Sequence, residues 1–390
     1  MLSSTLVIFQ TDSARPFRLI VSGGGTGGHT FPALTTVRAL RARTAERGLD
    51  VLWVGAAGSL EERVATAEGI AFAPVATGKV RRARSVLGML SAENARDMFR
   101  VPLGVYQACS IVRRFRPDVV LGTGGYVAVP VGVAARVCRV PLVIHEQTVR
   151  LGLANRVLAR GAARVAVTAE ASLDLLSAAA RRRAVVTGNP VRAEVLTGRA
   201  DRAPVDGFDL NLPTVYVTGG AQGARQINNL VTAILPWLLE HANVIHQCGP
   251  AEEPQVAAAA ATLPPPLAER YRVQGFVGAE LPDVLALADV VISRSGAGTI
   301  AEVTALGKAA VLIPLASSAG NEQAHNASHL QKAGAAVAML GEVTPEGLRA
   351  AIAPLLADPA RRTALAAQAR LHGRPDAAER LTDAVLSAVR

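Results

Sequence analysis

Short runs of apolar residues recur along the chain and alternate with longer segments in which Ala, Leu and Arg follow a helical spacing. Each run is continuous in hydrophobicity instead of alternating, which is typical of parallel strands buried on both faces. The segments between the runs have room for crossover helices, so the pattern predicts repeated βαβ units and an α/β fold. The predicted strands lie at residues 17–24, 51–56, 118–125 and 141–147 in the first half, and at 214–220, 243–249, 289–296 and 309–315 in the second.

A chain of 390 residues exceeds what one hydrophobic core usually serves, so two domains are expected. Residues 190–213 are polar, contain prolines and lack periodicity, which marks a boundary. A strand followed by GGGTGGH opens the first half and a strand followed by GGAQGAR opens the second. We therefore expect two Rossmann-like, doubly wound domains facing across a cleft, with ligands at the carboxyl ends of the strands. The predicted parts are an N-terminal extension (1–16), an N-terminal domain (17–195), a linker (196–212), a C-terminal domain (213–373) and a closing C-terminal helix (374–390).

The composition is that of a globular protein, with 50% hydrophobic and 4% aromatic residues. The net charge of +10 predicts an anionic partner, namely nucleic acid, an acidic membrane surface or a phosphorylated ligand, although a coding bias toward arginine explains the total equally well. The three cysteines are far apart and form no CxxC pair, which argues against a disulfide framework or a zinc cluster and fits a reducing cytoplasm. Neither a secretory signal nor a membrane-spanning segment is expected.

Residues 22–30 read SGGGTGGHT and follow the first predicted strand. Gly23, Gly25 and Gly28 fit the GxGxxG pattern of dinucleotide-binding turns. That function also needs an acidic residue after the second strand to bind a ribose, and Ala56 and Ala57 stand there, so a nicotinamide or flavin site is not expected. A turn that serves only helix–strand packing is an alternative. The favoured interpretation is a bare backbone that lets a phosphate or a sugar approach a helix N-terminus, where free N–H groups favour anions.

Two residues beside such turns are candidates for chemistry. His29 ends the first glycine run, where an imidazole that exchanges protons near neutral pH is able to act as a base, and a purely structural histidine is the alternative. The stretch SRSGAGTIAE (293–302) ends a strand, turns through two glycines and enters a helix that carries Glu302. This carboxylate is either a helix-dipole partner, stabilising by about 0.3–1 kcal/mol, or an acceptor for both hydroxyls of a ribose.

The motifs do not indicate a metal site. Residues 145–147 read HEQ, but Val149 stands where the HExxH zinc motif needs its second histidine. No Asp-x-Asp pair occurs, so the manganese clamp of metal-dependent sugar transferases is not expected. A sugar transfer by this chain is predicted to rely on helix dipoles and arginines, with neither metal nor cofactor.

Residues 79–116 mix basic and apolar side chains. One interpretation is an ordinary pair of solvated helices. The other is a surface that rests on anionic lipid, where each basic residue contributes about 1 kcal/mol. Nucleic acid is less favoured because aromatic stacking residues are scarce. The basic members are Lys79, Arg81, Arg82, Arg84, Arg100, Arg113 and Arg114, and the apolar members are Val86, Leu87, Met89, Leu90, Met98 and Phe99.

Eight motifs occur in the order found in the MurG family of GT-B glycosyltransferases, and the chain resembles that family from about residue 17 almost to its end. Any one motif is weak evidence, whereas eight in order are strong. The family's usual pattern differs at four positions, because Asn is usual at Thr148, Ser at Ala221, His at Glu322 and a bulkier apolar residue at Gly298. The motifs are GGGTGGHTFPAL, DVVLGTGGYVAVP, PLVIHEQ, GLANRVLA, TGNPVR, GGAQGAR, DVVISRSGAGTIAE and NEQAHNA.

The resemblance implies a family 28 enzyme that transfers N-acetylglucosamine from UDP-N-acetylglucosamine to the C4 hydroxyl of undecaprenyl-diphosphate-linked N-acetylmuramoyl pentapeptide (lipid I). The transfer inverts the anomeric carbon and forms lipid II for peptidoglycan. It also implies an acceptor-binding, membrane-associating N-terminal domain, a donor-binding C-terminal domain, a peripheral place on the cytoplasmic side of the cell membrane and cell-wall synthesis proteins as further partners. A GT-B enzyme with another lipid or glycolipid acceptor, and a membrane-bound protein that binds UDP without turnover, are the alternatives.

Residue roles follow from the same resemblance. His29 is the predicted catalytic base for the acceptor hydroxyl, and Glu146 is the second candidate. Glu302 is expected to bind the ribose, Val277 the uracil through its backbone, and Gln323 the sugar. The acceptor diphosphate is expected at Gly124, Gly125 and Tyr126. The full donor set is Thr26, Gly27, Gly28, Thr148, Arg192, Gly220, Ala221, Gln222, Gly223, Val277, Ser295, Gly296, Ala297, Gly298, Thr299, Glu302 and Gln323.

Overall fold

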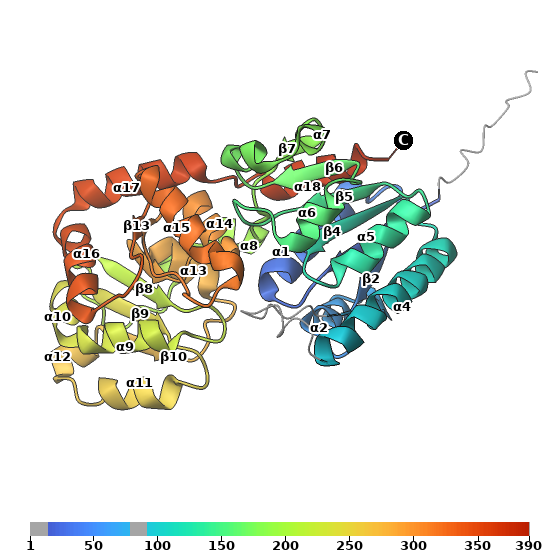
Figure 1. Ribbon diagram of the computed structural model, residues 1–390. Coiled ribbons are helices and arrows are strands. Elements are labelled where there is room, and N and C mark those ends of the chain that lie inside the picture. Colours follow the sequence, from blue (N-terminus) through green and yellow to red (C-terminus); the bar gives the residue numbers. More distant parts are fainter. Residues whose placement is uncertain (1–14, 79–91, 390) are drawn as a thin grey trace, which may run out of the picture.

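The chain forms two lobes, each built around one parallel sheet (Figure 1). The computed structural model describes residues 15–78 and 92–389, without the side chains of residues 92–99 and 319. The blue-to-green lobe of Figure 1 holds the first half of the chain, and the yellow-to-orange lobe holds most of the second half. The predicted pair of doubly wound α/β domains is confirmed.

Within the described residues the first sheet has seven parallel strands in the order β3-β2-β1-β4-β5-β6-β7. The order reverses direction between β1 and β4, and ligands of doubly wound sheets bind in the crevice beyond the strand ends at this point. The two glycine runs of the first half follow β1 and β4, so both lie at this crevice. The strands are β1 (Phe17–Gly23), β2 (Leu49–Gly55), β3 (Ala71–Pro74), β4 (Val119–Gly124), β5 (Leu142–His145), β6 (Arg164–Val167) and β7 (Ala184–Val186).

The second sheet repeats this plan with six parallel strands among the described residues, in the order β10-β9-β8-β11-β12-β13. Its reversal lies between β8 and β11, which are followed by GGAQG and by RSGAG. The weak sequence repeat therefore marks the same topological position in both domains. The strands are β8 (Thr214–Thr218), β9 (Asn243–Gln247), β10 (Tyr271–Gln274), β11 (Val290–Ser293), β12 (Ala309–Leu312) and β13 (Val337–Ala338).

All eight strands predicted from the apolar runs are present. Every residue of β4, β5, β8, β9, β11 and β12 is buried, as expected for parallel strands covered by helices on both faces. The apolar runs missed five strands of the described chain, β3, β6, β7, β10 and β13, each two to four residues long. Such short segments carry too little pattern, and pairing with a neighbouring strand determines them.

Helices cover both sheets and connect their strands. In the first domain and the linker they are α1 (Gly27–Arg43), α2 (Leu60–Ala67), α4 (Ala92–Phe115), α5 (Ala128–Val137), α6 (Leu153–Leu158), η1 (Glu170–Leu175), α7 (Ala178–Arg181), α8 (Ala193–Leu196) and η2 (Ala200–Arg202). In the rest of the chain they are α9 (Arg225–Ala233), α10 (Leu235–His241), α11 (Glu253–Ala260), α12 (Pro265–Ala268), α13 (Leu281–Leu287), α14 (Ala297–Leu306), η3 (Ala319–Asn321), α15 (Glu322–Lys332), α16 (Pro345–Ala357), α17 (Pro359–His372) and α18 (Ala377–Leu386).

The last helix belongs to the core of the first domain. Helix α18 packs against α1, and Leu381 and Val385, spaced by one turn, are fully buried in the same cluster as Leu19 and Trp53. In Figure 1 this red segment runs from α17 on the second lobe back to the first. The chain therefore connects the two domains twice, once after β7 and once before α18.

Candidate active site

A buried carboxylate holds the glycine loop that follows β1. Glu61, in the first turn of α2, is fully buried. Its Oε2 accepts from the Gly25 N–H at 3.2 Å, and its Oε1 accepts from the Ala56 N–H at 3.4 Å. A helix N-terminus and its glycine loop attract an anion, and here a side chain of the protein supplies one. No acid directly follows β2, as the sequence shows, but α2 brings one back to the loop.

Glycines are required where the loops after β1 and β4 meet. Gly25 and Gly125 have φ angles of +84° and +79°, in the left-handed region that favours glycine. A Cβ on Gly125 would overlap the backbone oxygen of Gly24, and a Cβ on Gly25 would lie 3.2 Å from the Tyr126 ring. The residues predicted to bind the acceptor diphosphate thus bring the two loops into direct contact at the crevice.

His29 lies half-buried in the first turn of α1. Its Nδ1 is 2.9 Å from the backbone oxygen of Thr123 and 2.8 Å from Oε1 of Gln147. Both oxygens only accept hydrogen bonds, so Nδ1 carries the proton and donates. In the neutral ring Nε2 then has the free lone pair and is able to take a proton.

Two buried residues at the end of β5 lie behind His29. The Nε2 of Gln147 donates to Thr123 O at 2.7 Å and lies 3.1 Å from both O and Nδ1 of His145. The Nε2 of His145 donates to Gly188 O at 2.9 Å. Burial lowers the pKa of His145 to about 4, partly opposed by the hydrogen bond to Gly188, so this ring is neutral at neutral pH.

Glu146 organises the loop that follows β5. Its Oε1 accepts from the backbone N–H of Thr148 at 3.2 Å, and its Oε2 accepts from Gly152 N–H at 2.9 Å and from Asn155 Nδ2 at 3.0 Å. The Thr148 hydroxyl lies 2.8 Å from Glu146 Oε1 and 2.7 Å from Arg150 O, so it is turned into its own loop. With both carboxylate oxygens engaged, Glu146 has the environment of a positioning residue more than that of a base.

Two residues predicted for the donor site contact each other in the second half. Arg192, which precedes α8, donates from Nη2 to Oε1 of Glu302 in α14 at 3.1 Å. The two side chains are 40% and 21% exposed. Burial raises the pKa of Glu302, and the charge and hydrogen bond of Arg192 oppose that rise. A positively charged guanidinium and a carboxylate thus lie side by side at α14, where both are partly exposed and can contact a bound molecule.

Gln247 connects the two loops predicted to hold the nucleotide. It ends β9, and its Oε1 accepts from the Val277 N–H at 2.8 Å while its Nε2 donates to Gly220 O at 2.9 Å. Because the N–H of Val277 donates to Gln247, the backbone carbonyl of Val277 is the group that remains available to bind uracil. The first turn of α14 begins after Gly296 and no described side chain caps it. Its N–H groups are therefore available to an anion, and a Cβ on Gly298 would meet open space.

The start of α15 links this region to the first domain. Ser295 Oγ donates to Gln323 O at 2.8 Å, and Gln323 Oε1 accepts from Leu315 N–H at 3.0 Å. Asn326 donates from Nδ2 to Ser295 O at 3.2 Å, and its Oδ1 accepts from Val149 N–H at 3.5 Å. Asn326 is 5% exposed and bridges the two domains.

Glu322, the first residue of α15, faces the first domain's candidates for catalysis. Burial raises its pKa; His29 lowers it and the charge of Glu146 raises it further. Glu322 therefore interacts electrostatically with both His29 and Glu146 across the domain boundary. At the same boundary Arg150 Nη1 donates to His325 Nε2 at 2.8 Å.

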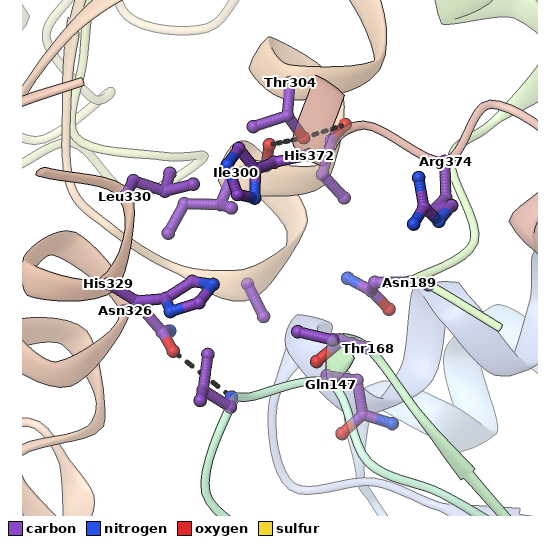
Figure 2. A pocket seen from close by; sticks show the side chains of 15 residues that line it. Gln147, Thr168, Asn189, Ile300, Thr304, Asn326, His329, Leu330, His372 and Arg374 are labelled. Atoms are coloured by element: carbon purple, nitrogen blue, oxygen red, sulfur yellow. Dashed lines mark hydrogen bonds between the residues drawn. The ribbon is translucent and has the colours of Figure 1, made fainter. Parts of the chain in front are cut away.

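Two cavities lie between the domains. The larger, about 400 Å³, opens between α1, α2 and the Gly278 loop, and Arg192 lines it. Since Gly278 follows Val277, this cavity adjoins the predicted uracil end of the donor site. The smaller, about 80 Å³, lies behind the loop after β5 (Figure 2). Figure 2 shows its lining from both domains, including Gln147, Thr168, Asn189, Ile300, Asn326 and His329.

The predicted residues thus fall into two groups. His29, Glu146 and the loops after β1 and β4 form the wall from the first domain, and Arg192, Glu302 and the loops after β8 and β11 form the wall from the second. Among the described residues no group of three His, Cys, Asp or Glu side chains is arranged to hold a metal ion. Among the residues of the site that carried no prediction are Glu61, Gln147, Gln247 and Asn326. Gln147 and Asn326 belong to the quoted motifs HEQ and NEQAHNA, whereas no local pattern marks the other two.

Comparison with known proteins places both domains in one family. Residues 19–167 match the glycosyltransferase family 28 N-terminal domain, and residues 214–381 match the family 28 C-terminal domain. A Listeria welshimeri protein is 36% identical over 95% of this chain and 99% of its own length. One from Xanthomonas campestris is 39% identical over 96% of this chain and 82% of its own. Both are named UDP-N-acetylglucosamine--N-acetylmuramyl-(pentapeptide) pyrophosphoryl-undecaprenol N-acetylglucosamine transferase.

Solved structures agree with this assignment. Acinetobacter baumannii MurG superposes with a TM-score of 0.73 at 27% identity and covers 95% of this chain and 100% of its own. The calicheamicin glycosyltransferase CalG4, at 17% identity and a TM-score of 0.67, shares the fold. The predicted GT-B architecture is therefore confirmed, and the chain belongs to the MurG family of family 28 glycosyltransferases.

Proposed function

We propose that this chain transfers N-acetylglucosamine from UDP-N-acetylglucosamine to lipid I and forms lipid II. The names of the full-length relatives support the donor and the acceptor. The observation that carries the proposal is that the two walls meet beside His29. Val149 N–H, in the loop after β5, donates to Asn326 Oδ1 of α15 at 3.5 Å, next to the Ser295–Gln323 contact, and His29 Nδ1 lies 2.8 Å from Gln147 Oε1 at the start of that loop. A base on one wall and the nucleotide loops on the other are what a direct transfer between two substrates requires.

In the proposed reaction the C4 hydroxyl oxygen of the acceptor attacks the anomeric carbon of the donor from the face opposite UDP. The bond to the UDP oxygen breaks as the new bond forms, which inverts the anomeric carbon. Nε2 of His29 takes the hydroxyl proton, because Nδ1 already carries one. Glu146 acts by holding the loop after β5, and Glu302 binds the ribose hydroxyls.

The negative charge that develops on UDP is stabilised without a metal ion in this proposal. The N–H groups at the start of α14 and the loop of Gly220 and Gly223 surround the place expected for the diphosphate. Donors fixed before the reaction contribute about 3–4 kcal/mol each to transition-state stabilisation in comparable sites. We assign donor binding to residues 213–373 and acceptor and membrane contact to residues 17–195, joined by the linker 196–212.

We also place the protein on the cytoplasmic face of the membrane as a peripheral enzyme. Among the described residues no helix is long and apolar enough to cross a bilayer. Residues 79–91 of the basic and apolar stretch lie outside the described residues, as do the side chains of Met98 and Phe99. The described part of α4 supports the placement, because one side of it exposes a mixture of apolar and basic residues. These are Arg100, Leu103 (50% exposed), Tyr106 (74% exposed), Arg113 and Arg114.

The decisive experiment is lipid II synthesis from purified lipid I analogue and UDP-N-acetylglucosamine, with and without EDTA. Undiminished product in EDTA is expected, and complete loss in the chelator would remove the metal-free mechanism. A panel of competing UDP-sugars tests the donor: efficient transfer of another sugar would reassign it. His29→Ala is expected to lose most of its turnover while still binding UDP, and near-normal turnover would exclude His29 from the chemistry.

A further inference from the structure

His29 is the last member of a chain of hydrogen bonds that begins at the segment between the domains. Gly188 follows β7, and its backbone oxygen accepts from His145 Nε2 at 2.9 Å. His145 Nδ1 lies 3.1 Å from Gln147 Nε2, and Gln147 Oε1 lies 2.8 Å from His29 Nδ1. We infer that His145 and Gln147 are positioning residues that determine which nitrogen of His29 carries its proton, and so make Nε2 the base. This inference rests on the proposed function.

The direction of each hydrogen bond follows from groups that only accept. Because Gly188 O is a carbonyl oxygen, His145 Nε2 must carry the proton, and its Nδ1 then has a lone pair. His145 is fully buried, and its neutral state keeps that lone pair available. His145 therefore presents an acceptor to Gln147 at neutral pH.

The amide of Gln147 has only one orientation that satisfies its surroundings. Its Nε2 lies 2.7 Å from Thr123 O and 3.1 Å from His145 O, and two carbonyl oxygens at these distances require a donor. A reversed amide would place its oxygen against both of them. With the nitrogen held on that side, Oε1 faces Nδ1 of His29.

The tautomer of His29 is thereby imposed by the protein. In water an imidazole favours the proton on the ring nitrogen farther from the backbone, which would leave Nε2 unable to act as a base. Gln147 Oε1 and Thr123 O together stabilise the opposite tautomer. Gln147 is 4% exposed and lines the small cavity behind the loop, so it acts through His29 (Figure 2).

Substitutions at Gln147 can distinguish a residue that positions the His29 proton from one that only packs against its neighbours. The titratable groups that interact with His29 are His145 from β5 and Glu322 from α15, and both stay in place when Gln147 is changed. Gln147→Leu removes one of the two acceptors for Nδ1, leaves Thr123 O as the other, and removes both amide N–H donors. Gln147→Glu keeps the shape and the acceptor for Nδ1 but places an oxygen where Nε2 donated to Thr123 O and His145 O. Its negative charge favours the protonated imidazole.

The test combines nitrogen NMR with kinetics on the full-length chain. Histidine labelled with ¹⁵N gives two-bond proton–nitrogen spectra that report the tautomer, and the His29 signals are those absent from His29→Ala. We expect the Nδ1–H tautomer in the wild type and a mixture in Gln147→Leu, with kcat lowered at least about tenfold and the KM for UDP-N-acetylglucosamine changed by less than about twofold. Exposed Gln255 of α11 provides the control Gln255→Leu, expected to match the wild type.

Gln147→Glu is the second variant and decides the matter if Gln147→Leu does not fold. In the pH profile of kcat for Gln147→Glu, the acidic limb is expected to move to higher pH, because His29 must lose its extra proton before it can act as a base. A merely structural role of Gln147 would not cause this shift. An unchanged tautomer in Gln147→Leu, or an unmoved acidic limb in Gln147→Glu, would overturn the inference. The proposed function fails separately: a wild type that makes no lipid II, yet loses the Nδ1–H tautomer in Gln147→Leu, would leave the positioning role standing.

Discussion

The backbone N–H of Gly25 donates to the carboxylate of Glu61, so an internal anion occupies the turn that first suggested a dinucleotide site. In a dinucleotide-binding turn the pyrophosphate takes this place. Here the Glu61 side chain occupies that place from the protein interior. Thr26 and Gly28, on the opposite side of the turn, are exposed. The glycines of this run therefore allow the backbone to turn tightly at the cleft wall and to lie directly against the loop after β4.

Glu61→Ala is expected to loosen this turn. The change removes a fully buried side chain and leaves the part-buried N–H groups of Gly25 and Ala56 without their acceptor. The expected cost is about 1 kcal/mol, the low end of the range for an unpaired buried donor. Urea unfolding should show a loss of that size. Glu62→Ala in the same helical turn is the control, because the Glu62 side chain accepts an exposed hydrogen bond from the Gly58 N–H and the backbone bonds of Glu62 are kept in the variant. Equal losses for the two variants would contradict the assigned role of Glu61.

Arg192→Gln is expected to weaken donor binding most strongly at low pH. Burial raises the pKa of Glu302 and Arg192 lowers it, so removing Arg192 raises the pKa further. The carboxylate is the form that accepts from both ribose hydroxyls, and the variant loses it at a higher pH than the wild type. As the pH is lowered, the KM for UDP-N-acetylglucosamine should begin to rise at a higher pH in the variant than in the wild type. Parallel KM profiles would refute this. Arg199→Gln, which removes an exposed partner of Asp201 in the linker, is the control.

The same substitution should have opposite effects at two glycines of the second domain. Gly223 has a φ of +71° and a Cβ there would overlap the Cys248 backbone oxygen, so Gly223→Ala is expected to destabilise by more than about 1 kcal/mol. Gly298 lies in the first turn of α14 with open space around its Cβ position, so Gly298→Ala is expected to stabilise by up to about 1 kcal/mol. Thermal melts of the two variants check both signs, and a destabilised Gly298→Ala would contradict the second.

Leu381→Ala in α18 is expected to destabilise the first domain, although it lies near the end of the chain. Leu381 is fully buried against α1, and removing such a side chain costs about 2–5 kcal/mol. Leu371→Ala in α17 is the matched control, because Leu371 is 67% exposed and should change stability by less than about 0.5 kcal/mol. Chemical unfolding followed by the fluorescence of buried Trp53, which shares the Leu381 cluster, measures the effect. An unfolding transition equal to that of the control would show that α18 is dispensable.

Leu103→Ser combined with Tyr106→Ser is expected to reduce binding to anionic vesicles. Both side chains are exposed on α4 beside Arg100, and burying them in the lipid headgroup region contributes with the basic charges. Co-sedimentation with vesicles of phosphatidylglycerol, and with vesicles of phosphatidylcholine alone, separates the apolar from the charge contribution. Leu210→Ser, at a linker position that is 89% exposed, should bind as the wild type does. Unreduced binding by the double variant would exclude this side of α4 as the contact.

The sequence predicted the buried strands and the loops that end them, because continuous apolar runs and glycine clusters are local signals. It did not predict that Glu61 accepts a hydrogen bond from the loop after β1. Helix α2 has a local sequence signal, but the packing of α2 on the sheet decides that the Glu61 side chain points toward Gly25. The hydrogen bonds of Gln147 and Gln247 could not be predicted either. Each links the end of one strand to a segment near the end of another, and only the folded sheet brings these segments together. Thr148 stays a predicted member of the donor site, and the structure adds that its hydroxyl lies within hydrogen-bond distance of Glu146 Oε1 and Arg150 O.

The return of α18 to the first domain also affects how the protein is made. Domains generally form as units during synthesis, beginning with the N-terminal one. Here Leu381 and Val385 follow the second domain in the chain, so the core of the first domain is completed only after the second domain has been made. The α1 surface of the nascent first domain therefore stays uncovered until α18, which follows the second domain, has been made.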